Sequence, residues 1–325
     1  MRKWIAAILM GLISLAAPMA LAQSEGEPEF AGCRGESVTI ADLQWPSASV
    51  LAHIHQQLIQ TEFKCAAQVV QSDLANVVAT IDAAQEPKIV PEMWVNRVAA
   101  QWNQIGEAQR AFLSTTTYDV AILEGWFVPA KVVGDFPQLQ ATDKLRDMPE
   151  LYARSKIRFI TCPEVWACHI LNDNLIRAFG LRDVFEVVVP ASRFEMDQLI
   201  GQVISGREPA VFYYWRPNAV LHQFDFAPLS LGNYDAEAYP CLAQTNCAAP
   251  QPSNFPSEEI GLVVASDVRA DMPELLGYLR RATMPVSVMN ELLAIQERQA
   301  LSSAATAAYF VSNFPDIWQS WVSAP

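Results

Sequence analysis

The feature that most constrains the fold of this chain is a regular alternation of short hydrophobic runs with longer segments of helical pattern. The short runs are rich in β-branched and aromatic residues, which fit a pleated sheet. They cover residues 38–44, 65–71, 88–94, 118–126, 156–161, 184–190, 210–215 and 258–266, and the clearest helical segments are 47–63, 74–85, 95–109, 164–180, 195–206 and 272–314. Strands that alternate with helices are typical of α/β domains with largely parallel sheets.

The length and composition predict two well-packed domains. A chain of 325 residues is long enough for about two domains of ordinary size. Because 51% of the residues are hydrophobic and only 18% are charged, a large core is available and extensive disorder is excluded.

The first 22 residues have the pattern of a cleavable signal peptide. Arg2 and Lys3 precede an apolar stretch over 5–20, and the small residues Ala20 and Ala22 frame a cleavage site before Gln23. The apolar stretch is short for a membrane-spanning helix, and a glutamine after the site does not indicate a lipid anchor. We therefore expect export to the periplasm and a mature chain that begins at Gln23.

The charge of the chain argues against nucleic-acid binding. Loss of Arg2 and Lys3 takes the formal net charge from −13 to −15. Such an acidic surface repels a phosphate backbone, whereas a small cation or zwitterion is compatible with it.

Six cysteines in an exported protein indicate three disulfides, and sequence alone permits 15 pairings. Neighbouring strands would bring Cys33 and Cys65 together, and Cys241 and Cys247 close a short loop, which leaves Cys162 with Cys168. The adjacent His169 keeps a metal or Cys–His interpretation of the last group open. A zinc site would need more ligands at tighter spacing, so the disulfide is favoured.

Five of the nine tryptophans lie at or just after the carboxyl end of an expected strand, the edge at which open α/β sheets bind ligands. These residues are Trp45, Trp94, Trp126, Trp166 and Trp215. A single tryptophan in such a place would be ordinary core packing, but five at equivalent positions predict a shared aromatic site.

A tryptophan cage suits a trimethylammonium group, whose charge is spread over methyl carbons. Each desolvated ring face contributes about 0.5–2 kcal/mol, so three or four faces are compatible with micromolar affinity, about −8 kcal/mol. Ser47, at a helix start beside Trp45, would help to hold the anionic end of a zwitterion. The helix that opens near 163–164 is a second candidate for that end. We expect Glu124, and less strongly Glu92, to face the cation.

Other chemistry is weakly supported. His169 and His222 are candidates for orienting an anion, although a structural role suits both better. The sequence has no phosphate loop and no HExxH or GxSxG motif, so we expect no enzyme activity, no catalytic residue and no cofactor. The acidic segment 233–239 lacks the spacing of a calcium loop, and we expect no metal there.

The chain resembles the substrate-binding proteins of ABC importers for glycine betaine and related osmolytes, in particular binders of trimethylamine N-oxide and betaine. The resemblance rests on ADLQWPSA, IVPEMWVN, ILEGWFVP, CPEVWACHILNDNL, FYYWRPNAVLHQFDF and CLAQTNCA, in that order. It implies a two-lobed periplasmic binding fold that the chain crosses twice, with the ligand in the cleft. It also implies that the five tryptophans are the cage positions and that Glu124 is an acidic position of the site. Glu164 and Val165 depart from the small residues that the resemblance leads us to expect before Trp166, which leaves the substrate open.

We therefore predict a periplasmic binding protein with lobe 1 over 29–127 plus 225–325 and lobe 2 over 128–224. It would act as a monomer, capture a small methylated ammonium compound and present it to an ABC permease in the inner membrane. Two alternatives remain at this stage: a ligand-sensing module for a signalling receptor, and a binder of choline or carnitine.

Overall fold

The computed structural model describes residues 33, 35–120, 124–136, 141–153, 155–164, 166–206 and 209–323. The predicted signal peptide, 1–22, lies outside the described residues. No helix in these ranges is long and apolar enough to cross a membrane.

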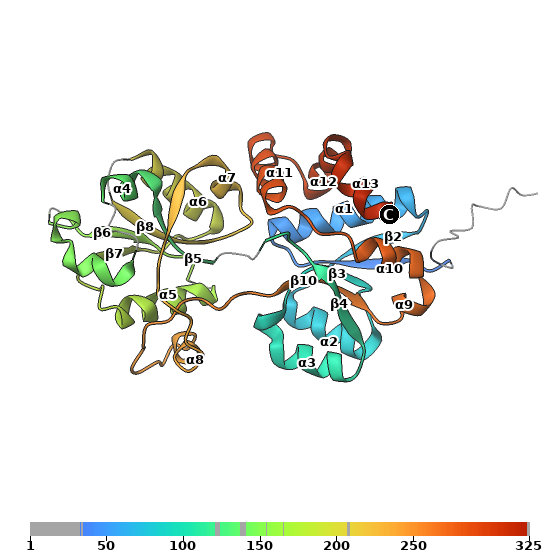
Figure 1. Ribbon diagram of the computed structural model, residues 1–325, viewed down its shortest axis with the longest axis horizontal. Helices are drawn as coiled ribbons and strands as arrows, with labels where there is room; N and C mark the ends of the chain where they lie inside the picture. The colour runs from blue at the N-terminus through green and yellow to red at the C-terminus, as the bar shows by residue number, and fades with distance from the viewer. Residues whose placement is uncertain are drawn as a thin grey trace, which may run out of the picture.

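The chain forms two lobes, each built on a five-stranded sheet flanked by helices (Figure 1). The first sheet has the order β2-β1-β3-β10-β4, with bounds Ala67–Gln71, Val38–Asp42, Ile89–Trp94, Ile260–Ala265 and Ala111–Thr116. The second has the order β7-β6-β8-β5-β9, with bounds Phe185–Val188, Ile157–Ile160, Ala210–Trp215, Glu124–Pro129 and Phe226–Leu229. These two α/β lobes are the architecture that the sequence predicts.

The helices are distributed over both lobes. In the first lobe they are α1 (Pro46–Glu62), α2 (Leu74–Ala84), η2 (Val95–Val98), α3 (Ala99–Glu107), α9 (Val268–Asp271), α10 (Pro273–Leu279), α11 (Val286–Gln299), α12 (Ser303–Asn313) and α13 (Pro315–Val322). In the second they are α4 (Ala130–Asp135), η3 (Thr142–Asp147), η4 (Pro149–Leu151), α5 (Ala167–Ala178), α6 (Arg193–Ser205), α7 (Ala219–Gln223) and α8 (Tyr239–Leu242).

In each sheet, the strand that follows a crossing from the other lobe is antiparallel to its neighbours. In the first sheet β1 is parallel to β2 and β3, whereas β10 is antiparallel to β3 and β4. In the second, β6 is parallel to β7 and β8, whereas β5 is antiparallel to β8 and β9. β5 and β10 are the first strands after the two crossings, so the crossings join the lobes at the ends of these strands.

The lobe boundaries differ from the expected ones. β5 and β9 both pair within the second sheet, so 124–129 and 226–229 belong to lobe 2 and not to lobe 1. The loop that contains α8 also packs on lobe 2, because the Asn174 side chain donates to the backbone oxygens of Leu242 and Gln244 at 2.9 and 2.8 Å. Lobe 2 is therefore larger than predicted.

Two strands were not predicted from the sequence. β4 has the sequence AFLSTT and is only partly buried, so it lacks the hydrophobic character of a central strand. β9 has the sequence FAPL and lies at the edge of its sheet, where a proline is tolerated.

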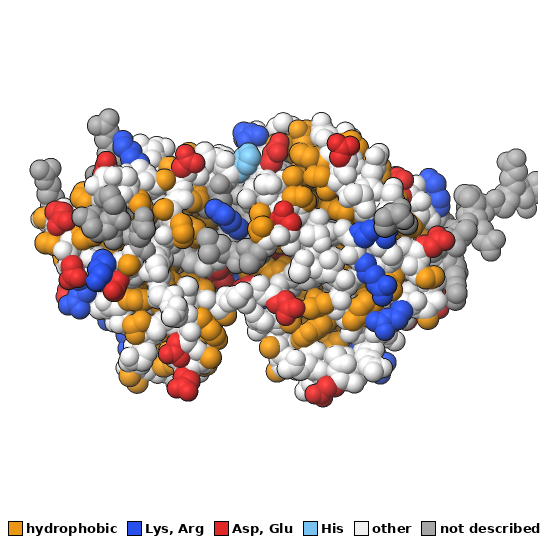
Figure 2. All heavy atoms as spheres, in the orientation of Figure 1, with side chains coloured by type: hydrophobic (Ala, Val, Ile, Leu, Met, Phe, Trp, Pro, Cys, Tyr) orange, Lys and Arg blue, Asp and Glu red, His pale blue; other side chains and the backbone are white. Residues whose placement is uncertain are grey.

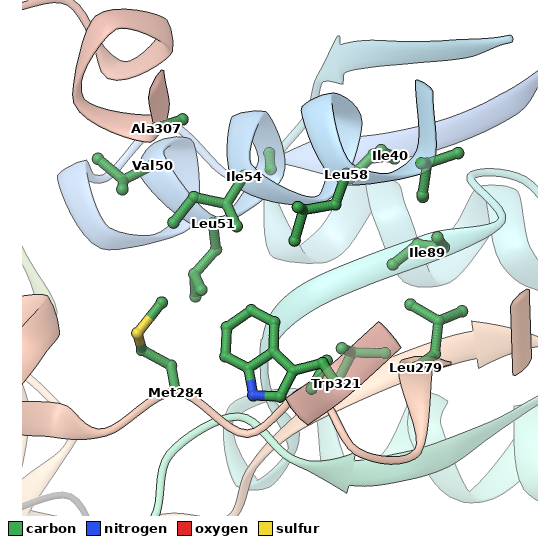
Figure 3. Close-up of a cluster of buried hydrophobic side chains, with 14 of the residues drawn as sticks. Ile40, Val50, Leu51, Ile54, Leu58, Ile89, Leu279, Met284, Ala307 and Trp321 are labelled. Carbon is green, nitrogen blue, oxygen red and sulfur yellow. The ribbon is translucent and has the colours of Figure 1, made fainter. Parts of the chain in front are cut away.

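The core of lobe 1 forms where α1 packs on its sheet (Figure 3). α1 begins at Pro46, a position where the missing N–H has no partner to lose. Its buried Leu51, Ile54 and Leu58 lie among Ile40 and Ile89 of the sheet and helical residues that include Leu279 and Trp321. Each fully buried aliphatic side chain contributes about 1.5–3 kcal/mol, and together they hold α1 on the sheet.

The lobes also touch through helices. α7 of lobe 2 lies beside α11 of lobe 1 (Figure 1). The Asn218 N–H donates to Asn290 Oδ1 at 2.7 Å, and Arg193 pairs with Glu297 at 3.3 Å.

All three predicted disulfides are present: Cys33–Cys65, Cys162–Cys168 and Cys241–Cys247. The pairing of Cys162 with Cys168 removes both thiols from the metal or Cys–His alternative. Within the described ranges no cluster of three or more histidine, cysteine or acidic side chains is arranged to hold a metal ion.

Candidate ligand-binding site

A cavity of about 390 Å³ lies between the two lobes, which Figure 2 shows as two bodies parted by a notch. Its walls come from both lobes and from the crossing segments. The lining residues are Trp45, Trp94, Arg97, Glu124, Trp166, Cys168, Leu171, Tyr213, Trp215, Tyr239, Ala243 and Glu258.

Four of the five predicted tryptophans meet at this cavity. Trp45 directly precedes α1 and Trp94 ends β3, so both belong to lobe 1. Trp166 directly precedes α5 and Trp215 ends β8, so both belong to lobe 2. The carboxyl ends of the parallel strands in each lobe thus deliver indole rings to one space.

The rings form one pair in each lobe. Trp45 and Trp94 have centroids 6.5 Å apart at an interplanar angle of 85°. Trp166 and Trp215 are 5.7 Å apart at 67°. Edge-to-face pairs are a favoured aromatic geometry, and each pair offers differently oriented ring surfaces to a guest.

Glu92 anchors the lobe 1 pair from behind. This carboxylate is fully buried and does not line the cavity. Its Oε1 accepts the indole N–H groups of Trp45 and Trp94 at 2.8 and 3.2 Å. Burial raises the pKa of Glu92, and the hydrogen bonds that it accepts oppose that rise.

Two hydroxyl groups complete the surroundings of Glu92. Ser47 Oγ donates to Oε1 at 3.1 Å and Tyr118 Oη donates to Oε2 at 2.8 Å. The placement of Ser47 differs from the prediction, because its hydroxyl neither caps α1 nor lines the cavity. Ser47 and Glu92 therefore support the tryptophans and do not form the wall.

The remaining charges of the cavity are Glu124 and Glu258, close to the two crossings between the lobes, and Arg97 of η2 in lobe 1. Glu124, at the start of β5, accepts the Tyr213 hydroxyl and pairs through Oε2 with Arg97 at 3.2 Å. Arg97 Nε lies 3.7 Å from Glu258 Oε1, and its guanidinium carbon lies 4.2 Å above the Trp94 ring. Burial raises the pKa of Glu258, whereas Arg97 opposes that rise. Two carboxylates and one guanidinium thus share one side of the cavity.

The family of the chain follows from its sequence as a whole. Residues 36–313 match the model of OpuAC, the substrate-binding domain of the ABC-type glycine betaine transport system. The chain belongs to this family. The matched range contains every residue that lines the cavity, so the cavity lies in the substrate-binding domain of an ABC importer family.

Solved structures share the fold of this OpuAC-family chain. An ABC-transporter choline-binding protein in complex with choline has a TM-score of 0.61 at 15% identity, over 91% of this chain and 93% of that one. Lactococcal OpuAC, closed around glycine betaine, has a TM-score of 0.61 at 16% identity, over 89% and 100%. A glycine betaine/L-proline-binding protein from Borrelia burgdorferi has 0.59 at 14%, over 89% and 97%. Among curated proteins the sequence has no match.

The two-lobed binding-protein fold and the OpuAC family assignment confirm the predicted resemblance. The family is one of transport proteins that bind a substrate and hand it to a permease, not one of enzymes.

Trp126 is the predicted cage residue that the structure places elsewhere. Its side chain is 1% exposed in the lobe 2 core, packs on Phe159 at 4.7 Å, and donates through Nε1 to Asn172 Oδ1 at 2.8 Å. The difference arises because β5 begins at Glu124, so Trp126 lies inside the strand and not beyond its end. Successive side chains alternate between the faces of a strand. Glu124 and Trp126 therefore share a face, with Glu124 at the cavity and Trp126 deeper in the lobe.

The histidines do not line the cavity. His169 is half-buried in the first turn of α5, and its Nδ1 has no hydrogen-bond partner within the described part of the chain. His222 is exposed at the end of α7. Both lie apart from the cage, although His169 follows the cavity residue Cys168.

Sequence reasoning missed Arg97, Tyr213, Tyr239 and Glu258. For two of them, the spacing from a tryptophan in the sequence indicates a position at the cavity. Arg97 follows Trp94 by three residues, which brings it back over the ring when the chain turns into η2. Tyr213 precedes Trp215 by two residues and shares its strand face. Tyr239 and Glu258 reach the cavity only through the path of the long loop, which no local pattern encodes.

Proposed function

We propose that this protein is the exported binding component of an ABC importer and that it captures a trimethylammonium osmolyte in the tryptophan cage. Glycine betaine, trimethylamine N-oxide or a close relative is the proposed ligand. The observation that carries the proposal is the meeting of four tryptophans, two from each lobe, around one cavity with an acidic side. Its volume of about 390 Å³ falls in the usual range of small-molecule sites, about 300–1,000 Å³.

The chemistry of the walls supports an onium head group. A trimethylammonium group donates no strong hydrogen bonds, so ring faces match it better than a polar pocket does. Glu124 and Glu258 add negative charge on one side of the cavity. Together the rings and carboxylates attract a bulky cation electrostatically, and the cation does not have to donate a hydrogen bond to any of them.

The anionic end of a zwitterion has a candidate partner at the start of α5. Trp166 is the N-cap residue of this helix, and no side chain caps the helix start. Cys168 and Leu171 of its first turns line the cavity. The free N–H groups and dipole of a helix N-terminus favour a carboxylate or an N-oxide oxygen. We propose that the ligand lies with its head among the rings and its anionic end toward α5.

Transport would use the two-lobed design. Ligand contacts to both lobes favour the closed arrangement, because the closed state alone offers all of them. The closed protein would then dock on the permease from the periplasmic side, after removal of 1–22. Mass analysis of protein released from the periplasm tests the export step, with a mature chain that starts at Gln23 as the expected result.

Titration calorimetry of the mature protein tests the ligand class. The panel is glycine betaine, trimethylamine N-oxide, choline and carnitine, and we expect about micromolar affinity for at least one. The control is 3,3-dimethylbutan-1-ol, which has the shape of choline without its charge. Cation–π binding predicts at least about tenfold weaker binding of this alcohol than of choline. Failure of every ammonium compound to bind, or equal affinity for the alcohol, contradicts the proposal.

A further inference from the structure

Arg97 lines the cavity with a side chain that is 45% exposed, and it places a cation of the protein itself beside the aromatic and acidic groups there. Its guanidinium carbon lies 4.2 Å above the Trp94 ring, one of the four cage rings. Its Nη2 lies 3.2 Å from Glu124 and its Nε 3.7 Å from Glu258. These are the ring and the carboxylates that an ammonium ligand would use, so any bound cation lies close to a fixed positive charge.

Arg97, Glu124 and Glu258 together carry more negative than positive charge. The side chains of Glu124 and Glu258 are only 8% and 5% exposed, and one guanidinium serves both. Glu258 Oε2 is buried without a hydrogen-bond partner among the residues described. Burial lowers the pKa of Arg97, but the neighbouring carboxylates outweigh this and leave its pKa above the usual value. Arg97 therefore stays charged and offsets one of the two negative charges.

We propose that Arg97 is a specificity-determining residue that makes the cavity prefer ligands without net charge over net cations. This inference rests on the proposed function, because it assumes that a methylammonium compound occupies the cage. Without Arg97 the two carboxylates would attract a net cation strongly. With Arg97 that excess attraction is reduced. A zwitterion is affected less, because its two ends respond to the positive charge in opposite senses.

Glycine betaine and choline separate these effects, because they share the trimethylammonium head and differ in a carboxylate against a hydroxyl. The measured quantity is the ratio of the Kd for choline to the Kd for glycine betaine at one fixed ionic strength. A role of Arg97 that is only structural would change both dissociation constants together and leave this ratio unmoved.

Four variants test the proposal by calorimetry. Arg97→Met removes the charge but keeps most of the stem, and we expect the ratio to fall at least about tenfold. Arg97→Lys keeps the charge and should hold the ratio near that of the wild type. Glu258→Gln removes a negative charge and should raise the ratio. Arg269→Met is the matched control, because Arg269 lies 4.4 Å above Phe112 outside the cavity lining, and both affinities should stay unchanged.

The outcomes separate this inference from the proposed function. If the wild-type protein binds neither compound nor any other ammonium ligand, the proposed function fails and the inference falls with it. If the wild type binds and Arg97→Met leaves the ratio unchanged, the inference alone is overturned. It is also overturned if Arg97→Met and Arg97→Lys weaken both ligands equally, since Arg97 would then act as a tie between the lobes.

Discussion

The two walls of the cavity are made of the same residue type but are held in different ways. In lobe 1 the indole N–H groups of Trp45 and Trp94 both donate to the buried Glu92. In lobe 2, Trp166 and Trp215 lie against each other, and the Tyr213 and Tyr214 rings pack on Trp215 at 6.2 and 5.0 Å. Hydrogen bonds fix direction, whereas ring contacts tolerate small shifts. By these contacts the lobe 1 rings are fixed in orientation by hydrogen bonds, whereas the lobe 2 rings are held by packing.

The carboxylates behind the two walls, one buried and one half-buried, repeat this contrast. Glu92 accepts hydrogen bonds from four side chains of lobe 1. Asp197 on α6, in lobe 2, accepts the Tyr214 hydroxyl and lies 3.7 Å from the Arg193 guanidinium. The lobe 1 carboxylate thus bonds directly to rings that line the cavity, whereas Asp197 bonds to Tyr214, the neighbour of Trp215 in the chain. Substitutions on the two sides should therefore have unequal effects.

The largest effect is expected for Glu92→Ala. It removes the acceptor of four buried or part-buried donors at once. Donors left without partners are costly, so we expect the free energy of unfolding to fall by about 3 kcal/mol or more. Ligand affinity should also fall, because both lobe 1 rings lose their anchor. Urea denaturation and calorimetry measure the two losses.

Glu92→Gln is the control for this variant. The amide oxygen still accepts hydrogen bonds, but the negative charge behind the rings is gone. Stability should recover in large part, and any affinity still missing then reports the charge. If Glu92→Ala is no less stable than the wild type, the account of the rigid wall is wrong.

The next largest effect concerns Asp197 and pH. Burial raises its pKa to about 6 from 3.8, although the Tyr214 hydrogen bond and Arg193 oppose the rise. A carboxyl group with a raised folded-state pKa binds its proton more tightly when folded. Its stabilising contribution is therefore fully present below about pH 4 and is lost as pH rises through about 6. The loss amounts to at most about 3 kcal/mol.

Urea denaturation of the wild type and of Asp197→Asn between pH 4 and pH 7 checks this sign. Asparagine still accepts the Tyr214 hydroxyl but does not titrate. The wild type should lose stability relative to the variant as pH rises. A difference that stays constant across this range would show that the pKa of Asp197 is not raised by folding.

The lobe 2 rings themselves should matter for affinity and little for the fold. Trp166 and Trp215 are both half-buried at the cavity. We expect Trp166→Ala and Trp215→Ala each to weaken the preferred ammonium ligand tenfold or more, about 1.4 kcal/mol. Calorimetry measures affinity, and circular dichroism checks that the fold survives. Unchanged affinity in both variants would remove the lobe 2 wall from the site.

The parts of this design that follow simple periodic rules could be predicted from the sequence. The positions of Trp45, Trp94, Trp166 and Trp215 are predictable because strand ends can be recognised from hydrophobic runs and because such ends meet at one edge of a sheet. The three disulfides could be predicted from the signal-peptide pattern and the spacing of the cysteines. The partners of Glu92 were not predicted, because hydrogen bonds from four separate segments depend on tertiary packing.

Errors arose where a boundary moved by a few residues. A strand expected over 118–126 begins instead at Glu124, which turned Trp126 from a predicted cage residue into a core residue. The same shift moved β5 into lobe 2. Glu258 and Tyr239 depend on the long loop after β9, whose course is set by contacts with α5 and not by its own sequence pattern.

The smallest expected effect on binding is that of Trp126→Phe, and it tests the division between wall and core. Trp126 lies 1% exposed beneath lobe 2, outside the cavity lining. Phenylalanine keeps most of the packing against Phe159 but leaves Asn172 Oδ1 without its indole donor. We expect the free energy of unfolding to fall by about 1–3 kcal/mol, with ligand affinity within about twofold of the wild type.

Trp215→Phe is the matched control, because the same change at the cavity should weaken binding with little loss of stability. If Trp126→Phe clearly loses affinity at full stability, Trp126 contributes to ligand binding, and the assignment of this residue to the core alone is wrong.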